Sequence, residues 1–191
     1  MANTTTRYVS YNGASSATFG MTVQDKGAST GLPNMTQLTM VPVGIGGTLQ
    51  TYRFILAAES TTSVSSLYVQ PNLSFTATSA TTRLYQIFAN ISISADAGSG
   101  SILMGHYTLA TVCKVSSTGI PTLIGSGAFK VETSLKDSGM EAYVGDTSIS
   151  VTLTNSSSQY YPRITVTFNT NPTACDMLAD ITINSTNIVA S

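Results

Sequence analysis

The strongest restriction on the fold is an alternation of apolar and polar residues with a period of two, broken by Gly or Pro roughly every 8 to 15 residues. The alternation is cleanest over 85–93, 149–153 and 164–168. Successive side chains of a β-strand point to opposite faces of its sheet, so this period predicts strands with one buried face. No segment sustains the i, i+3, i+4, i+7 pattern of an amphipathic helix. The sequence therefore predicts an all-β fold.

From residue 35 onward, ten strands are expected. Their segments are rich in Thr, Val, Ile and Tyr, which suit a pleated and half-buried surface. The connecting segments are short and contain turn-forming residues, which favours antiparallel neighbours and an antiparallel β-sandwich or jelly-roll. The expected strands are Thr36–Val43, Leu49–Ala57, Val64–Val69, Leu73–Thr78, Leu84–Ser94, Ile102–Val115, Thr122–Val131, Ser148–Thr154, Arg163–Asn169 and Leu178–Asn184. The residues expected in the core are Ile87, Ile91, Ile149, Val151, Ile164, Val166 and Phe168.

Residues 1–34 are less regular, since they are polar and are broken by several glycines. We expect them to form an irregular N-terminal arm in front of a β-sandwich at 35–191, which a boundary near 79–82 would subdivide. A flexible terminus is the alternative for the isolated chain. The alternation of Phe19, Met21 and Val23 nevertheless predicts that part of the arm pairs with another surface. The arm residues expected to make such contacts are Tyr8, Tyr11 and Phe19.

Charged residues make up only 9% of the chain, against about 25% in a typical soluble domain, and 30 Thr and 26 Ser take up much of the difference. The net charge is −1 and the basic residues are scattered, whereas a nucleic-acid-binding protein needs a basic patch or stripe. No apolar run approaches the ~20 residues of a membrane span, and the N-terminal MANTTTRYVSYNG lacks the apolar core of a signal peptide. We therefore expect no nucleic-acid partner and no membrane partner.

Residues able to support catalysis or bind a metal are few. His106 is the only histidine and lies within an expected strand, and no G-x-S-x-G motif supplies a nucleophile, so we expect a structural role for it. One His and two distant Cys do not make a zinc site. The acidic residues lie in or beside polar, loop-like segments, where solvated side chains are the simplest reading: Asp137, Glu141, Asp146, Asp176 and Asp180. We expect no enzyme activity, no cofactor and no metal.

Two further pairs of residues leave alternatives open. Cys113 and Cys175 are expected to be buried free thiols, and a disulfide between them is the alternative. Tyr160 and Tyr161 lie in an expected loop that opens the strand at Arg163. They are either an aromatic anchor at the strand end or a contact to a ligand or a second subunit.

Three segments in the second half of the chain carry a resemblance to a known class of proteins. They are RLYQIFANISISADAGSGS, GHYTLATVCKVSSTGIPTLIGSGAFKV, and the Thr-rich series TSISVTLTNSSSQYYPRITVTF with ADITINSTNIV. From about residue 83 to its end, the chain resembles β-sandwich domains of bacteriophage and related viral structural proteins, especially capsid decoration and tail-fibre or spike modules. Such modules often contain a Trp, which this chain lacks. The resemblance implies a virion location and a homo-oligomer, specifically a trimer, and carries over no catalytic residue.

A physical argument from composition leads in the same direction. Long charged side chains are costly to order and to desolvate, whereas Ser and Thr are short and pair with nearby backbone groups. A surface poor in charge can therefore pack against copies of itself with little repulsion. Together with what the resemblance implies, this leads us to expect a non-enzymatic virion protein, capsid- or tail-associated, that binds copies of itself and other virion proteins. The alternative is a module that recognises host glycans through loops carrying Tyr160 and Tyr161. A hydrolase that works through His106 or a carboxylate pair is a third hypothesis.

Overall fold

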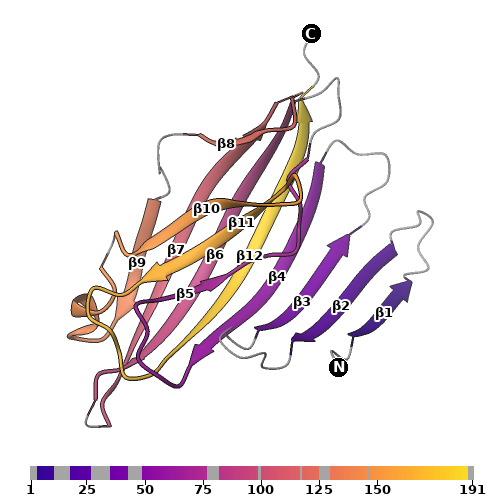
Figure 1. Cartoon of the computed structure of the whole chain (residues 1–191). Coiled ribbons are helices and arrows are strands. Elements are labelled where there is room, and N and C mark those ends of the chain that lie inside the picture. The colour runs from indigo at the N-terminus through magenta and orange to yellow at the C-terminus, as the bar shows by residue number, and fades with distance from the viewer. Residues whose placement is uncertain are drawn as a thin grey trace.

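The computed structural model describes residues 4–10, 18–26, 35–42, 49–76, 82–98, 100–116, 118–124, 130–145 and 147–188. These residues form twelve strands and one short 3-10 helix, at Met140–Ala142 (Figure 1). The strands are β1 (Thr4–Ser10), β2 (Thr18–Lys26), β3 (Met35–Pro42), β4 (Leu49–Ser60), β5 (Ser66–Val69), β6 (Thr82–Asp96), β7 (Ile102–Val115), β8 (Pro121–Leu123), β9 (Lys130–Lys136), β10 (Ile149–Ser156), β11 (Gln159–Thr167) and β12 (Cys175–Ile188).

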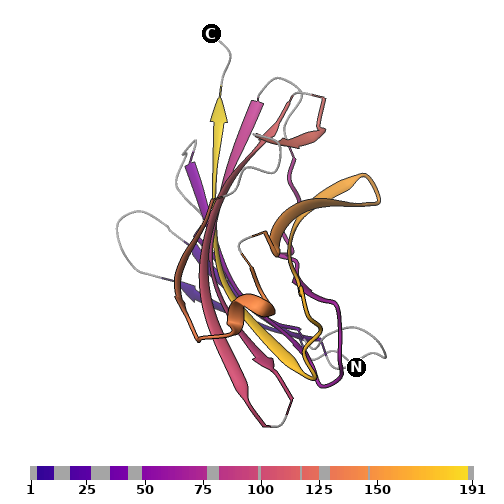
Figure 2. The ribbon, with the colours of Figure 1, turned by 90° about the vertical axis from the view of Figure 1, so that its left-hand side faces the viewer.

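The strands form two antiparallel sheets that pack against each other (Figure 2). The larger sheet has nine strands in the order β1-β2-β3-β4-β12-β6-β7-β8, and β9 also pairs with β7. The smaller sheet has the order β10-β11-β5. The last strand, β12, lies between β4 and β6 and pairs with both along most of its length. The expectation of an all-β sandwich is confirmed, and the jelly-roll connection stays a prediction.

The core lies between the two sheets and follows the alternation of the sequence. Along β6, every second residue from Tyr85 to Ala95 is buried. Because β12 and β7 flank β6 in register, their buried positions continue the same face. The smaller sheet contributes the opposite wall of the core, and all seven residues expected in the core are buried. Burial of each large apolar side chain stabilises the fold by about 1.5–3 kcal/mol.

A glycine and an aromatic ring are in close contact near the start of β7. Tyr107 is fully buried, and its hydroxyl donates a hydrogen bond of 3.2 Å to the carbonyl of Val144. Its ring lies against Gly105, where an added Cβ would come within 2.7 Å of the ring. The pairing of β7 with β9 shifts register between His106 and Tyr107. Gly105 is therefore needed here because the ring occupies the space of a side chain.

The segment expected to be an irregular arm contains two strands, so that expectation is wrong for residues 4–10 and 18–26. β1 pairs with β2, and β2 pairs with β3, so the larger sheet continues across the expected boundary at residues 34 and 35. The prediction that Phe19, Met21 and Val23 belong to a paired segment is confirmed. The physical reason is that backbone groups in an alternating segment find partners by joining a sheet edge. Most of the boundary expected near 79–82 lies outside the described residues.

Two expected strands differ from those observed. Within 73–78, only Phe75 pairs, through a single bridge to Tyr160, and residues 77 and 78 lie outside the described part of the chain. The expected strand Thr122–Val131 is divided between β8 and β9, and residues 125–129 between them are also outside the described ranges. β8 and β9 each pair with β7.

Candidate functional site

Tyr160 and Tyr161, expected in a loop, lie within β11. Ser157 and Ser158 both have positive φ, 51° and 64°, which is the conformation of a two-residue hairpin turn between β10 and β11. The strand therefore begins before the tyrosines. The carbonyl of Tyr160 accepts a 2.7 Å hydrogen bond from the backbone of Phe75, and the Tyr161 hydroxyl donates to the side chain of Gln159. Both side chains are half-buried, which fits an anchor in the smaller sheet.

His106 lies in β7 on the face of the larger sheet that is turned away from the core. It is half-buried, and its Nδ1 is 3.1 Å from the hydroxyl of Ser92, which is its directly paired neighbour on β6. Asp137 accepts a 2.8 Å hydrogen bond from the backbone of Met104. Asp176 accepts a 3.1 Å bond from the Ser94 hydroxyl. These groups are bonded to sheet neighbours.

The other expected acidic residues have separate surroundings. Glu141 forms an ion pair with Lys136, and Asp146 lies outside the described residues. In the described ranges, no three His, Cys, Asp or Glu side chains gather closely enough to hold a metal ion. That the chain is not an enzyme stays a prediction.

Cys113 and Cys175 are both buried and both carry free thiols in the structure. Cys113 belongs to the inward face of β7, and Cys175 begins β12. Desolvation raises the pKa of Cys113 to about 12 and that of Cys175 to about 11. Both sulfurs are thus protonated near neutral pH and pack as small apolar groups.

The outer face of the larger sheet, the face opposite the core, exposes several large apolar side chains. Leu178 on β12 is 50% exposed, Phe88 on β6 is 45% exposed, and Met104 on β7 is 58% exposed. Leu135 on β9 is 74% exposed and is paired with His106. These residues come from four adjacent strands. A cluster of this kind on one face marks an interaction surface more often than apolar residues scattered singly.

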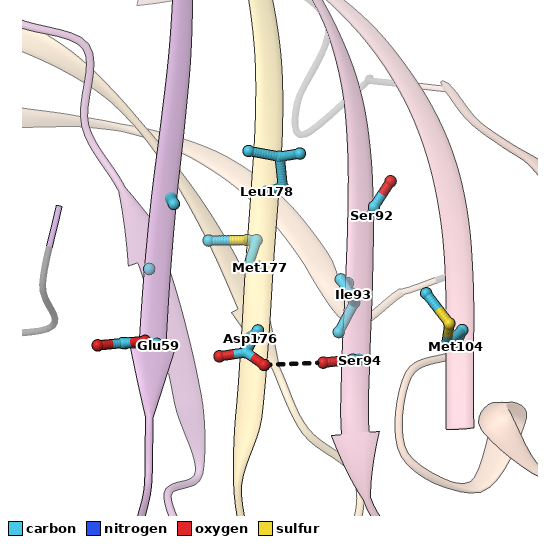
Figure 3. Close-up of a pocket in the computed structure, with 10 residues that line it drawn as sticks. Glu59, Ser92, Ile93, Ser94, Met104, Asp176, Met177 and Leu178 are labelled. Atoms are coloured by element: carbon cyan, nitrogen blue, oxygen red, sulfur yellow. Dashed lines mark hydrogen bonds between the residues drawn. The ribbon is translucent and has the colours of Figure 1, made fainter. Parts of the chain in front are cut away.

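A shallow groove crosses this outer face (Figure 3). It has a volume of about 490 Å³ and runs over β4, β12, β6 and the start of β7. Small side chains create it, because Ala57, Ser92 and Ser94 stand beside the larger Leu178 and Met104. The buried residues Ala58, Ile93 and Met177 contribute to its floor, and Glu59 and Asp176 lie at one end.

A second hollow of about 320 Å³ adjoins the first and shares Ser92 and Met104 with it. It extends the concave region over β7 toward β9, where Leu135, Lys136 and Asp137 line it. The two hollows therefore lie side by side on the outer face, with Ser92 and Met104 lining both.

An ion pair lies beside this region at the seam between β4 and β12. The Arg53 guanidinium donates two hydrogen bonds to the Asp180 carboxylate, at 2.9 and 2.5 Å, from a directly neighbouring strand. These hydrogen bonds hold the pKa of Asp180 below its ordinary value. Each charge of the pair neutralises the other at this seam, so the seam presents little electrostatic field.

The strands β1, β2 and β3 extend the larger sheet beyond the part that the smaller sheet covers (Figure 1). In the described residues, β1 pairs with β2, β2 with β3 and β3 with β4, while β5, β10 and β11 lie over the strands from β4 onward (Figure 1). Of the expected arm contacts, Tyr8 lies in β1 and Phe19 in β2, while Tyr11 lies outside the described residues. We call β1, β2 and β3 the single-layer flank.

The strand register shows how the flank continues the larger sheet. Leu38 of β3 is paired with Ile55 of β4, and Val23 of β2 is paired with Leu38. Thr39 of β3 is paired with Phe54 of β4. The flank therefore extends the sheet beyond β4 in regular antiparallel register.

Comparison of the chain with protein-family models, with curated proteins and with solved structures finds no match. No helix in the described part of the chain has the length and apolar character needed to cross a membrane.

Proposed function

We propose that this protein is a non-enzymatic structural subunit that assembles with copies of itself, as a capsid- or tail-associated component of a virion. The observation that carries the assembly part is the single-layer flank, in which three strands extend the larger sheet beyond the part that the smaller sheet covers (Figure 1). The virion part rests on the sequence resemblance to viral β-sandwich modules. Other virion proteins are the further partners that this proposal implies.

The flank supports assembly for a simple energetic reason. Ordering a backbone costs about 1–2 kcal/mol per residue, and a sheet offsets this cost when at least one of its faces packs on another layer. In the part of the chain that the structure describes, the smaller sheet lies over the strands from β4 onward (Figure 1). A neighbouring subunit would supply the missing layer for β1, β2 and β3. The low charge of the chain, with 8 basic and 9 acidic residues, permits many identical neighbours without strong repulsion.

A truncated chain tests the proposal. Deletion of residues 1–34 removes β1 and β2 and leaves intact the strands that enclose the core. We expect the truncated chain to keep its β circular-dichroism spectrum and a cooperative unfolding transition, but to associate more weakly than the full chain in sedimentation velocity. The spectrum and the transition are the control for folding.

Two results would contradict the proposal. If the full chain stays monomeric at every concentration, self-assembly is wrong. If the full chain instead binds members of a glycan array and stays monomeric, the receptor-binding alternative replaces it.

A further inference from the structure

We infer that the outer face of the larger sheet, from β4 to β9, packs against the same face of a second copy of this chain. The inference rests on the proposed function, because it names the surface through which self-assembly takes place. The residues that carry it are Leu178, Phe88, Met104 and Leu135, which are about half exposed or more. They lie on four strands that are adjacent in the sheet.

The size of the face fits a stable pair of subunits. From Thr51 to Glu59, at about 3.4 Å per residue, the face is about 30 Å long, and five strands spaced by about 4.8 Å make it about 24 Å wide. The resulting area of roughly 700 Å² is close to the ~800 Å² that each partner buries in an interface of standard size. The flank extends the sheet itself beyond β4.

The charges of the face favour a copy of the chain over a strongly charged partner. Arg53 and Asp180 neutralise each other on its β4 side, and Asp176 is hydrogen-bonded to Ser94. A highly basic or acidic partner would find no electrostatic potential of opposite sign at that pair. A copy of the chain presents the same neutralised pair and the same apolar residues, and the acidic residues Glu59, Asp137 and Asp176 line the hollows toward one end of the face.

The shape of the face is also suited to a copy of itself. The depression over Ser92 and Ser94 lies beside the protruding side chains of Leu178 and Met104. In a two-fold contact the same patch serves both subunits, so protrusions of one copy meet depressions of the other. Two sheets that pack in this way lie about 10 Å apart, with their side chains interleaved. A two-fold pair differs from the trimer that the sequence resemblance implies.

Charge-introducing variants test the inference. Phe88→Asp and Leu178→Asp each place a carboxylate in the centre of the face, at positions where the isolated chain already meets solvent. The matched control is Ile120→Asp, at the turn before β8, where the side chain is 57% exposed. Sedimentation equilibrium measures the dissociation constant of each full-length variant, and circular dichroism confirms folding. If a carboxylate prevents folding, Phe88→Ser and Leu178→Ser replace these variants.

We expect the wild-type chain to form a species of twice its 19.9 kDa mass. The two variants of the outer face should weaken this association at least ~10-fold, which corresponds to about 1.4 kcal/mol, and Ile120→Asp should leave it unchanged. Wild-type association that the outer-face variants do not weaken, or that yields a trimer, overturns this inference and leaves self-assembly standing. A wild-type chain that stays monomeric contradicts the proposed function itself.

Discussion

Truncation of Phe168 to Ala tests the placement of the core. Phe168 follows β11 and is 5% exposed, so nearly all of its ring is removed from water. Loss of roughly 100 Å² of buried apolar area costs about 2.5 kcal/mol at 25 cal/mol per Å². A residual void of about 50–100 Å³ adds about 1–2.5 kcal/mol, because the core collapses only partly around it. The expected loss in the free energy of unfolding is therefore about 3–5 kcal/mol.

The matched control for this variant is Phe88→Ala, which removes the same ring from the outer face. Phe88 is 45% exposed, so we expect this change to cost less than about 1.5 kcal/mol in the monomer. Urea unfolding monitored by circular dichroism, at protein concentrations low enough to prevent association, measures both variants. A loss below about 1 kcal/mol for Phe168→Ala, or equal losses for the two variants, would refute the assignment of the faces.

Three other changes test separate features of the structure. Gly105→Ala should lower the free energy of unfolding by about 1–3 kcal/mol, because the new methyl group meets the Tyr107 ring, and unchanged urea unfolding would show that the ring moves aside freely. Cys113 and Cys175 should react with a thiol reagent at pH 8 far more slowly in the folded chain than in urea, since burial raises the pKa of both thiols, and equal rates would contradict their burial. Asp180 has a lowered pKa in the folded chain, so its ion pair stabilises the fold above the ordinary carboxyl value of 3.8, and that contribution is lost as the pH falls through the lowered value. Asp180→Asn should therefore have a lower free energy of unfolding than the wild type at neutral pH, and this difference should shrink in acid. A difference that is independent of pH would count against the pair.

The sequence was sufficient to predict the class of the fold and much of its core. A period of two is a local signal, so each clean segment identifies its own buried face without knowledge of the neighbours. Ile87 and Ile91 on β6 illustrate this, since both alternate with smaller or polar residues and both are buried. The strand order was not predictable in the same way. The position of β12 between β4 and β6 depends on pairing with residues 80 or more positions away in β6 and more than 100 positions away in β4.

The apolar outer face was not predicted, because alternation within one strand does not reveal whether the second face of a sheet packs against another layer. Phe88 and Leu178 occupy positions that alternate with the core, and their size is the only local sign of an apolar outer face. Their proximity requires the pairing of β12 with β6, which the sequence does not display. The two tyrosines were assigned to a loop because four consecutive polar residues, 155–158, precede them closely, whereas only two of these form the turn.

The salt dependence of self-association tests the central claim most directly. If apolar side chains on an outer face with few charges hold the copies together, ionic strength has little to screen. Sedimentation equilibrium of the full chain, from low salt to molar sodium chloride, should give dissociation constants that agree within about threefold, or association that strengthens slightly at high salt. Dissociation into monomers as the salt rises would show that charge pairs hold the assembly, and would contradict the account.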